Sequence, residues 1–297
     1  MQKKLVSIII NCYNGEKYLF QTLKAILSQT YKEYEVIFID NCSEDSSAKI
    51  FKKIKDIIFK YFKLRKKKTL YSARNFALKK CKGTFITFLD ADDWWDKNFL
   101  YFRKSFFNSS SKYGFCYSNC YHFFEKKKKY FPFTNSKLPH GFVLNELLSF
   151  YSVKMGTIIV KKKLFSKYQF NPRYNIIGDF DFIIRISKYF KAMSFQDKLV
   201  NIRIHESNMT HTNRKKFYTE FKYWIKKQDF NNLYFKKNKK TLFQKLEYLE
   251  LIYLVLEKKK LKLFFRIIKF EEFKKKIKLL LILFTPKFIL NHYIKHF

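Results

Sequence analysis

Three short apolar runs near the N-terminus, each followed by polar residues, constrain the fold more than any other feature of the chain. They are Leu5–Ile10, Tyr34–Ile39 and Thr84–Leu89, and apolar, β-prone runs of about six residues are typical of strands buried on both faces. Residues 16–28 have apolar side chains at helical spacing, and a second helix is predicted over residues 46–62. Strands that alternate with helices predict a mostly parallel sheet with right-handed crossovers, and hence an α/β fold.

Three carboxylates follow the third apolar run within four positions. They are Asp90, Asp92 and Asp93. Clustered acids at the end of a buried strand are costly unless a cation or hydrogen-bond donors meet them. Mg²⁺ or Mn²⁺, held by Asp90 or Asp92 together with phosphate oxygens, fits this arrangement because these ions take few protein ligands. The alternative is an acidic turn in which Asp92 or Asp93 caps the next helix.

Polar side chains follow each of the three predicted strands. Asn11 and Tyr13 follow the first strand, Asp40 follows the second, and Asp90 and Asp92 follow the third. Because the carboxyl ends of parallel strands meet at one edge of a sheet, we expect a pocket there for a ligand with a base, a sugar and phosphates. Neither the dinucleotide pattern GxGxxG nor the P-loop pattern GxxxxGK[ST] occurs in the chain.

The composition is strongly basic. The chain has 62 Lys and Arg against 24 Asp and Glu, a formal net charge of +38. Such an excess indicates a polyanion or an anionic surface nearby in the cell, and nucleic acid, anionic lipid and nucleotide phosphates all qualify. Part of the charge reflects a general bias toward Lys, Phe, Ile, Tyr and Asn, so the charge alone does not identify the partner.

The cysteines and the apolar tracts indicate a cytoplasmic setting. The five cysteines are odd in number, irregularly spaced and without a CxxC pair, which favours reduced thiols over disulfides or a zinc site. Residues 1–4 lead directly into the first strand, so we expect no signal peptide. The strongly apolar tract Leu279–Phe284 is far shorter than the roughly 20 residues of a membrane-spanning helix.

Four segments within the first hundred residues resemble the successive motifs of family 2 glycosyltransferases. In chain order, the segments are Val6–Asn14, Asp40–Asp45, Ser72–Asn75 and Phe88–Asp93. The resemblance is strong over residues 5–100, continues more weakly to about residue 212 and does not extend to the C-terminal third. It implies the GT-A fold, a Rossmann-like architecture with a mostly parallel central sheet flanked by helices, of the kind found in enzymes of bacterial polysaccharide and glycoconjugate synthesis.

The resemblance also implies which residues bind a nucleotide-sugar donor. They are Asn11, Tyr13, Asp40, Asn41, Arg74 and Asp90. The first four would face the nucleotide base, Arg74 would lie near the base or the phosphates, and Asp90 would contact the ribose or the sugar. Asp92 would hold the Mn²⁺ or Mg²⁺ that bridges the diphosphate. Many family members have two aspartates where this chain has Asp40 and Asn41.

Two further acids begin a predicted helix whose apolar face includes Ile183 and Ile186. Asp179 and Asp181 lie in its first turn, where the helix dipole favours negative charge, so both acids have a purely structural explanation. The resemblance, however, places the catalytic base of the family here. Asp179 matches that position in the pattern Gly-Asp-x-x-Phe, and Asp181 is the alternative.

The segment Asn201–Thr210 resembles a family segment whose histidine lies near the metal or the diphosphate. His205 is therefore a second metal candidate, although a lone histidine is often a structural residue. This segment closes the catalytic domain, which we expect to span residues 1–213.

Residues 214–297 differ from the rest of the chain, and we expect a basic, amphipathic, helical region there. They contain 23 Lys or Arg and seven Asp or Glu, and Leu246, Leu249, Tyr253 and Leu256 recur at helical spacing. Basic amphipathic helices lie in a membrane interface or pack on a partner. We expect peripheral contact with an anionic membrane surface at the inner face of the cytoplasmic membrane; the alternative is that the apolar face covers the catalytic domain.

The sequence therefore predicts an inverting, metal-dependent glycosyltransferase. It would move a sugar from a nucleoside-diphosphate sugar, such as a UDP-sugar, to a hydroxyl of a glycan or lipid-linked saccharide, with Asp179 as the base. The charge suggests a nucleic-acid-binding protein instead, but the strand-end acids would repel phosphate, so we expect no nucleic-acid partner. A catalytically degenerate transferase that serves as an assembly subunit is a further alternative.

Overall fold

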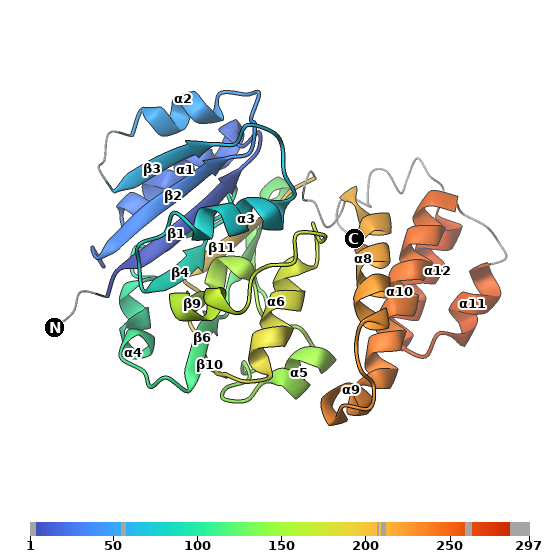
Figure 1. Cartoon of the computed structure of the whole chain (residues 1–297). Helices are drawn as coiled ribbons and strands as arrows, with labels where there is room; N and C mark the ends of the chain where they lie inside the picture. Colours follow the sequence, from blue (N-terminus) through green and yellow to red (C-terminus); the bar gives the residue numbers. More distant parts are fainter. Residues whose placement is uncertain (1–3, 55–57, 207, 209–211, 259–262, 286–297) are drawn as a thin grey trace. The chain divides into compact units, whose positions relative to one another are not determined.

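The structure is a computed structural model that describes residues 4–54, 58–206, 208, 212–258 and 263–285 (Figure 1). The chain divides into two compact units, Met1–Ile204 and His205–Phe297.

A mixed sheet forms the centre of the first unit, and the described residues contribute seven strands to it. In their order across the sheet, the strands are β10 (Lys191–Phe195), β6 (Tyr113–Ser118), β9 (Ile159–Lys161), β4 (Phe85–Phe88), β1 (Val6–Cys12), β2 (Tyr34–Asp40) and β3 (Phe59–Lys63). The four strands from β4 to β3 are parallel, and β9 runs antiparallel to both of its neighbours. The predicted α/β fold with a mostly parallel central sheet is confirmed.

The apolar composition of the central strands explains their position. Ile8, Ile10, Val36 and Phe38 are fully buried, as expected for strands that are covered on both faces. The helices of this unit are α1 (Glu16–Leu27), α2 (Ser47–Lys52), α3 (Leu70–Leu78), α4 (Lys104–Phe107), α5 (Leu144–Ser149) and α6 (Gly178–Ser187). Figure 1 shows α3 and α6 on one side of the sheet, and α3 packs on β1 and β2. These two helices carry residues of the candidate site.

The helix predicted over residues 46–62 is wrong in its second half. Helix α2 ends at Lys52, and β3 pairs in parallel with β2; residues 55–57 lie outside the described residues. Phe59 and Tyr61 lie two positions apart and therefore share one face of the strand. Their ring centroids lie 5.8 and 5.6 Å from that of Phe51 on α2. Aromatic side chains two residues apart are buried together on one face of a strand, which a helix does not allow.

A second, smaller sheet adjoins the carboxyl end of β4. Its strands, in spatial order, are β5 (Trp94–Trp95), β11 (Val200–Ile204), β7 (Tyr121–Phe124) and β8 (Lys129–Pro132). Strand β5 follows β4 after only the residues 89–93. The acidic turn is therefore fixed at both of its ends by strands, and these strands belong to different sheets.

The second unit is helical. Its helices are α8 (Arg214–Lys226), α9 (Leu233–Lys237), α10 (Lys239–Lys258), α11 (Leu263–Lys269) and α12 (Phe273–Phe284). Apolar side chains of α10, α11 and α12 form its core, including Leu251, Val255, Ile267 and Leu279. The predicted helical C-terminal region is thus confirmed. Within the described ranges, no helix has the length and apolar character that are needed to cross a membrane.

Candidate active site

The ends of strands β1, β2 and β4 bring polar residues to one edge of the sheet. Cys12 of β1 is paired with Asp40 of β2, and Ile9 of β1 is paired with Phe88 of β4. The residues that follow these strands must therefore lie near one another. This edge is also the position at which open parallel sheets bind ligands.

Arg74 and Asp90 form an ion pair at this edge. Arg74 projects from α3, its side chain is only 3% exposed, and its Nη2 donates a hydrogen bond to Oδ1 of Asp90 at 2.8 Å. The guanidinium also lies 5.4 Å from the ring centroid of Tyr71 and 5.3 Å from that of Phe88. Asp90 keeps 43% of its side chain exposed. The pair therefore joins a buried, fixed cation to a carboxylate that a ligand can reach.

Neighbouring acids raise the pKa of Asp90. Its position in the protein desolvates the carboxyl and raises its pKa, Arg74 lowers the pKa, and the charges of Asp92 and Asp179 raise it again. Asp92 and Asp179 therefore lie within electrostatic reach of Asp90. The site thus brings acids from two distant parts of the sequence, the turn after β4 and the start of α6, to the same edge of the sheet.

Arg203 on β11 fixes the acidic turn. Its backbone N–H donates to Oδ1 of Asp93 at 2.8 Å, and its Nε donates to the carbonyl oxygen of Asp92 at 3.0 Å. Its guanidinium lies 4.4 Å from the ring centroid of Tyr18 and 4.7 Å from that of Trp94. Asp93 is buried, and burial raises its pKa well above the ordinary value, with Asp92 and Asp90 adding to the effect. Asp93 is therefore a structural residue of the turn.

These contacts decide which residues could hold a divalent cation. Among the described residues, no cluster of three or more His, Cys, Asp or Glu side chains is arranged to bind a metal. Asp93 is buried against Arg203, which makes Asp90 and Asp92 the candidate protein ligands. One or two carboxylates fit Mg²⁺ or Mn²⁺ when substrate phosphates and water supply the remaining ligands.

His205 begins the second unit, so its position relative to the acids is outside what the structure defines. Its backbone N–H donates to Oδ1 of Asn208 at 2.6 Å. Residues 207, 209 and 210 of the segment Asn201–Thr210 fall outside the described ranges. A role for His205 as a metal ligand stays a prediction.

Asp179 occupies the first turn of α6, next to the helix that carries Arg74. The hydroxyl of Tyr71 donates to Oδ1 of Asp179 at 3.3 Å, and the backbone N–H of Phe180 donates to the same oxygen at 2.7 Å. Gly178 makes this packing possible, because a Cβ atom at its position would lie less than 3.0 Å from three ring atoms of Tyr71. A glycine therefore precedes the acid for a steric reason.

Asp181 has a different environment. Its Oδ2 accepts a hydrogen bond from Nε of Arg185 at 2.9 Å, one helical turn further along, and its side chain is 9% exposed. An acid that is buried and paired within its own helix is poorly placed to take a proton from a substrate. The geometry therefore favours Asp179 over Asp181 as the base.

Two basic side chains lower the pKa of Asp179. Burial raises its pKa above the ordinary value, and the N–H of Phe180, Arg74 and Lys154 lower it. Lys154 precedes a short 3₁₀ helix at residues 155–157, and its Nζ lies 4.5 Å from the ring centroid of Phe133. Burial lowers the pKa of Lys154, and Cys120, Asp179 and Asp93 oppose that effect. Lys154 therefore lies close enough to Asp179 for the charges of the two groups to affect each other.

Comparison with known proteins assigns this arrangement to a family. The sequence profile of the family Glycosyl transferase family 2 matches residues 7–181. The chain belongs to this family. The match begins in β1 and ends in α6, so it includes the acidic turn, Arg74 and Asp179.

Individual relatives agree with this assignment. The UDP-Glc:alpha-D-GlcNAc-diphosphoundecaprenol beta-1,3-glucosyltransferase WfaP of Escherichia coli is 36% identical over 146 residues. The alignment covers 49% of this chain and 51% of WfaP, so the chain spans about half the length of this relative.

Solved structures share the fold. TarS of S. aureus in complex with UDP-GlcNAc has a TM-score of 0.62 at 18% identity, covering 87% of this chain and 77% of TarS. The mannosyltransferase PcManGT from Pyrobaculum calidifontis, in complex with GDP-Man and Mn²⁺, has a TM-score of 0.60 at 14% identity, covering 97% and 83% of the two chains. The fold of the family 2 chain is accordingly the predicted GT-A fold.

Two residues predicted to face the base hold the loop between β3 and α3. The side-chain amide of Asn41 donates to the carbonyl oxygen of Lys68 and accepts from its N–H, both at 2.9 Å. Asn11 donates to the carbonyl oxygen of Leu70 at 3.2 Å, and its own Oδ1 is buried without a partner in the described part of the chain. This family 2 chain thus uses Asn41, where many members have Asp, to fix a basic loop at this edge of the sheet.

The other two residues predicted to face the base, Asp40 and Tyr13, differ in exposure. Asp40 is fully buried, and its two carboxylate oxygens accept hydrogen bonds from the N–H of Ser43 at 2.7 Å and the hydroxyl of Tyr61 at 2.6 Å. Tyr13 is 42% exposed, and Nζ of Lys67 lies 3.3 Å from its ring centroid. Asp40 therefore shapes the turn after β2, and Tyr13 presents a ring to solvent. Direct contact of either residue with a base stays a prediction.

Sequence reasoning did not identify Arg203, Lys154 or Tyr61 as residues that shape this site. Each is a common residue type in this chain, which has 62 Lys and Arg and 21 Tyr. Lys154 and Tyr61 lie in no motif, and the segment Asn201–Thr210, which contains Arg203, directs attention to His205 instead. Only the tertiary contacts of β11, of the loop before β9 and of β3 identify them.

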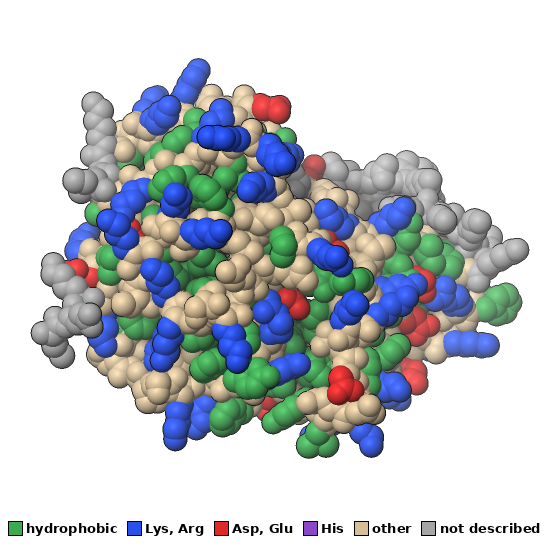
Figure 2. Space-filling view, viewed as in Figure 1, with side chains coloured by type: hydrophobic (Ala, Val, Ile, Leu, Met, Phe, Trp, Pro, Cys, Tyr) green, Lys and Arg blue, Asp and Glu red, His purple; other side chains and the backbone are tan. Residues whose placement is uncertain are grey.

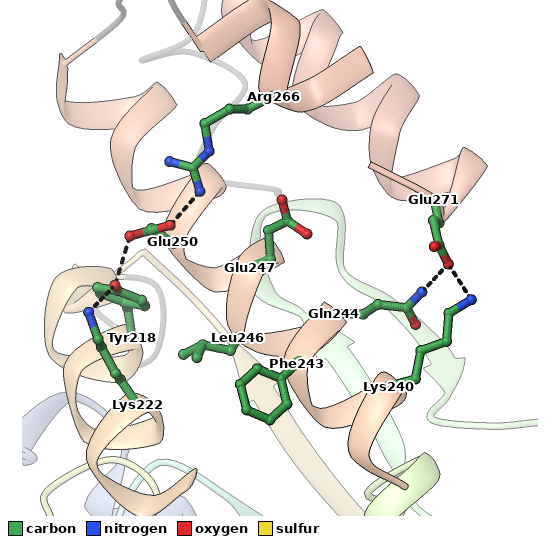
Figure 3. Close-up of a pocket in the computed structure, with 10 residues that line it drawn as sticks. All are labelled: Tyr218, Lys222, Lys240, Phe243, Gln244, Leu246, Glu247, Glu250, Arg266 and Glu271. Atoms are coloured by element: carbon green, nitrogen blue, oxygen red, sulfur yellow. Dashed lines mark hydrogen bonds and ion pairs between the residues drawn. The ribbon is translucent and has the colours of Figure 1, made fainter. Parts of the chain in front are cut away.

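A separate pocket of about 450 Å³ lies in the second unit (Figure 3). Glu250 accepts hydrogen bonds from the hydroxyl of Tyr218 at 2.8 Å and from Arg266 at 2.5 Å, and Glu271 lies 2.8 Å from Nζ of Lys240. These bonds connect α10 to α8 and α11 and to the residues before α12. The pairs are explained by helix packing and do not indicate a ligand.

Proposed function

We propose that the chain is an inverting glycosyltransferase that moves a sugar from a UDP-sugar to a hydroxyl of a lipid-linked saccharide. The observation that carries the proposal is the placement of Asp179 at the start of α6. The hydroxyl of Tyr71, on the same helix as Arg74 of the Arg74–Asp90 pair, donates to Oδ1 of Asp179 at 3.3 Å. WfaP, whose printed name describes a UDP-Glc donor and a diphosphoundecaprenol-linked acceptor, supports the choice of substrates.

The donor would bind along the carboxyl ends of β1, β2 and β4. Oδ1 of Asn11 is buried without a partner among the described residues, and an N–H group of a base would supply one. The guanidinium of Arg74 would hold the carboxylate of Asp90 in the orientation that accepts a hydrogen bond from a ribose or sugar hydroxyl. Exposed lysines of the loop at residues 65–68 would face the negative charge of the diphosphate.

Asp92 and Asp90 would hold Mn²⁺ or Mg²⁺ together with the phosphates of the donor. The metal would neutralise negative charge on the diphosphate as it departs. Arg203 contributes by fixing the backbone of Asp92, because it bonds to the carbonyl oxygen of that residue. A rigid turn keeps the carboxylates in place and limits the conformational entropy that binding would otherwise cost.

Asp179 would act as the general base. It takes the proton of the acceptor hydroxyl while the acceptor oxygen forms a bond to the anomeric carbon of the sugar. The bond from that carbon to the diphosphate oxygen breaks, and its electron pair leaves with the diphosphate. A single displacement of this kind inverts the anomeric configuration. The raised pKa of Asp179 supports the role, since a more basic carboxylate accepts a proton more readily.

The acceptor places the enzyme at a membrane. We assign catalysis to residues 1–213 and contact with the inner face of the cytoplasmic membrane to the basic region at residues 214–297, which has 23 Lys or Arg against seven Asp or Glu. Attraction to an anionic leaflet contributes about 1 kcal/mol for each nearby basic residue. Such contact would bring the enzyme to a lipid-linked saccharide in the membrane.

The test is a transfer assay with the full chain and a panel of nucleotide sugars. We expect transfer from a UDP-sugar to a diphosphoundecaprenol-linked sugar with Mn²⁺ or Mg²⁺, a loss of product with EDTA, and inversion of the anomeric carbon by NMR. Asp92→Asn should keep the fold and lose metal-dependent donor binding. Turnover that is unchanged by EDTA, or a product of retained configuration, would contradict the proposal.

A further inference from the structure

Helix α12 has two apolar faces, and one of them is exposed to solvent. Leu279, Ile282 and Leu283 are buried in the core that α12 shares with α10 and α11. On the other face, the side chains with exposed fractions of 41–70% are Phe273, Ile277, Leu281 and Phe284. We call these four residues the α12 stripe. The core of the second unit explains the first face and does not explain the stripe.

The spacing of the stripe makes it one continuous surface. Its members are separated by four, four and three positions, and each position turns an α-helix by about 100°. The four side chains therefore lie within an arc of about 80°. Single exposed apolar residues are common on protein surfaces, but an aligned row of large ones marks an interaction surface.

Lysines border the stripe on both sides. Lys274 and Lys278 follow it on one side of the helix and Lys276 on the other, by the same count of about 100° for each residue. Helix α12 contains no acidic residue. Long lysine side chains beside an apolar row can lie along it and place their charges at the level of lipid headgroups. This arrangement suits a helix that lies flat in a membrane interface.

The neighbouring helix extends the same chemistry. Phe265 and Ile268 of α11 are 72% and 45% exposed, and Arg266 and Lys269 of the same helix are exposed as well. The rings of Phe264 on α11 and Phe284 on α12 lie 5.9 Å apart, which fixes the two helices against each other. On the face that Figure 2 shows, basic and apolar side chains of the second unit lie next to one another, with acidic side chains among them.

We propose that the α12 stripe inserts into the interface of an anionic phospholipid bilayer, with the bordering lysines at the phosphate groups. The inference deepens the membrane contact proposed above and rests on it. Charge complementarity favours a membrane as the partner of this surface. The lysines match anionic headgroups, the apolar row between them matches acyl chains, and the helix itself contains no acid. With 12 residues, α12 is too short to span the bilayer, so it lies on the surface.

Vesicle flotation of the full chain tests the stripe. We expect binding to vesicles of phosphatidylcholine with phosphatidylglycerol, and little binding to phosphatidylcholine alone. The double variant Phe273→Ser with Leu281→Ser should bind at least about tenfold more weakly. Binding would then no longer transfer two large apolar side chains from water into the bilayer. The matched control is Phe142→Ser with Leu233→Ser, two residues outside α12 that are 62% and 75% exposed. The control should bind as wild type does.

A second pair of variants tests the lysines. Lys274→Glu with Lys276→Glu should weaken binding to anionic vesicles by at least about tenfold. Lys163→Glu with Lys167→Glu changes the net charge equally at two exposed lysines of the first unit and should have a much smaller effect. Equal losses in the two pairs would show that only net charge matters and would overturn the role of α12.

Fluorescence gives a readout that does not depend on loss of binding. Trp94, Trp95 and Trp224 of the wild-type chain also fluoresce, so the wild-type emission is subtracted from that of Ile277→Trp. The difference should be blue-shifted and quenched by brominated lipid when anionic vesicles are added. Unquenched emission with bound protein would overturn insertion. Wild-type binding by the stripe variant, or stripe-dependent self-association in solution in place of vesicle binding, would overturn the proposal as well, the latter because a second copy would then be the occupant.

The same preparations separate this inference from the proposed function. Slow hydrolysis of the nucleotide sugar in solution needs no membrane, and the stripe variant should retain it at the wild-type rate. Hydrolysis without vesicle binding would refute the inference alone. Vesicle binding by a chain that neither transfers nor hydrolyses any nucleotide sugar would refute the proposed function alone.

Discussion

The hydroxyl of Tyr71 donates a hydrogen bond to Oδ1 of Asp179 across 3.3 Å, although 108 positions separate the two residues in the chain. Tyr71 lies on α3 three residues before Arg74, and Asp179 lies in the first turn of α6. The contact therefore joins the helix that holds the Arg74–Asp90 pair to the helix that carries the proposed base. A displacement of either helix changes where the carboxylate of Asp179 points.

Gly178→Ala should disturb that contact. An added Cβ would lie less than 3.0 Å from three ring atoms of Tyr71, and overpacking of this kind costs about 1–3 kcal/mol. We expect a lower free energy of unfolding in urea and reduced transfer. Gly156→Ala is the control, because its Cβ would meet Val200 at 3.4 Å, an ordinary contact. If the two variants lose equal stability, the close approach of Gly178 to Tyr71 has no special importance.

Asp179→Asn should reduce transfer by at least about 10²-fold while donor affinity changes little. The amide keeps the shape of the side chain but cannot accept the proton of the acceptor hydroxyl, and base assistance is commonly worth about 10²–10⁴ in rate. An effect on turnover without an effect on donor binding is the pattern of an interaction made in the transition state. Single-turnover kinetics and donor titration measure the two quantities.

Asp181→Asn is the matched control for that variant. It removes the ion pair with Arg185 within the same helix, so we expect a small loss of stability and near-normal transfer. An inactive Asp181 variant together with an active Asp179 variant would show that the base lies two residues further along α6.

The same Asp179→Asn variant should also change how stability depends on pH. Burial raises the pKa of Asp179 in the folded chain above its ordinary value of 3.8, so the folded state binds this proton more tightly than the unfolded state does. Ionisation of Asp179 therefore opposes folding, and its cost develops as the pH rises through the folded-state pKa. Relative to wild type, the variant should be more stable near pH 7 than near pH 4, as measured by urea unfolding. The opposite trend would mean that the pKa is lowered.

The central strands were predictable because their stabilisation is local in the sequence. Each of β1, β2 and β4 is rich in apolar residues, and a short segment of this kind identifies a buried strand without knowledge of its neighbours. Strand β3 was not predictable in this way. Its sequence Phe-Lys-Tyr-Phe-Lys mixes aromatic and basic residues without strict alternation. Its partners Phe38 and Phe51 come from elements that lie elsewhere in the chain.

The candidate site divides along the same line. Local sequence motifs contain four of the candidate residues, so the sequence alone was enough to predict them. They are Arg74, Asp90, Asp92 and Asp179. Arg203 donates a hydrogen bond to Asp92, which lies 111 positions away in the chain. A local sequence pattern does not predict a contact between residues so far apart. Side chains that orient other side chains are therefore the residues that sequence reasoning misses.

Asn41→Asp should loosen the basic loop before α3. The amide of Asn41 both donates to and accepts from the backbone of Lys68, whereas a carboxylate can only accept and would face the carbonyl oxygen of Lys68. Loss of one buried hydrogen bond with an unpaired acceptor costs about 1–3 kcal/mol. We expect a lower urea midpoint and faster tryptic cleavage within residues 65–68. Asn231→Asp, at an exposed position, should change neither.

Lys154 offers the sharpest test of the electrostatics of the site. The charge of Lys154 is one of the factors that lower the pKa of Asp179 against the effect of burial. Lys154→Met removes the charge and keeps a side chain of similar length. The pKa of Asp179 should then rise, so the base stays protonated to a higher pH.

The expected result is a shift of the acidic limb of the kcat–pH profile toward higher pH, with reduced transfer below the new limb and recovery above it. A lost structural contact would instead lower kcat at every pH and leave the limb in place, so the two explanations give different profiles. Lys154→Arg keeps the charge and should keep the wild-type limb. Lys163→Met removes an exposed lysine of the same unit and should also leave the limb unchanged. An unshifted limb in Lys154→Met would show that Lys154 does not set the charge state of Asp179, and its position beside Phe133 would then be a matter of packing alone.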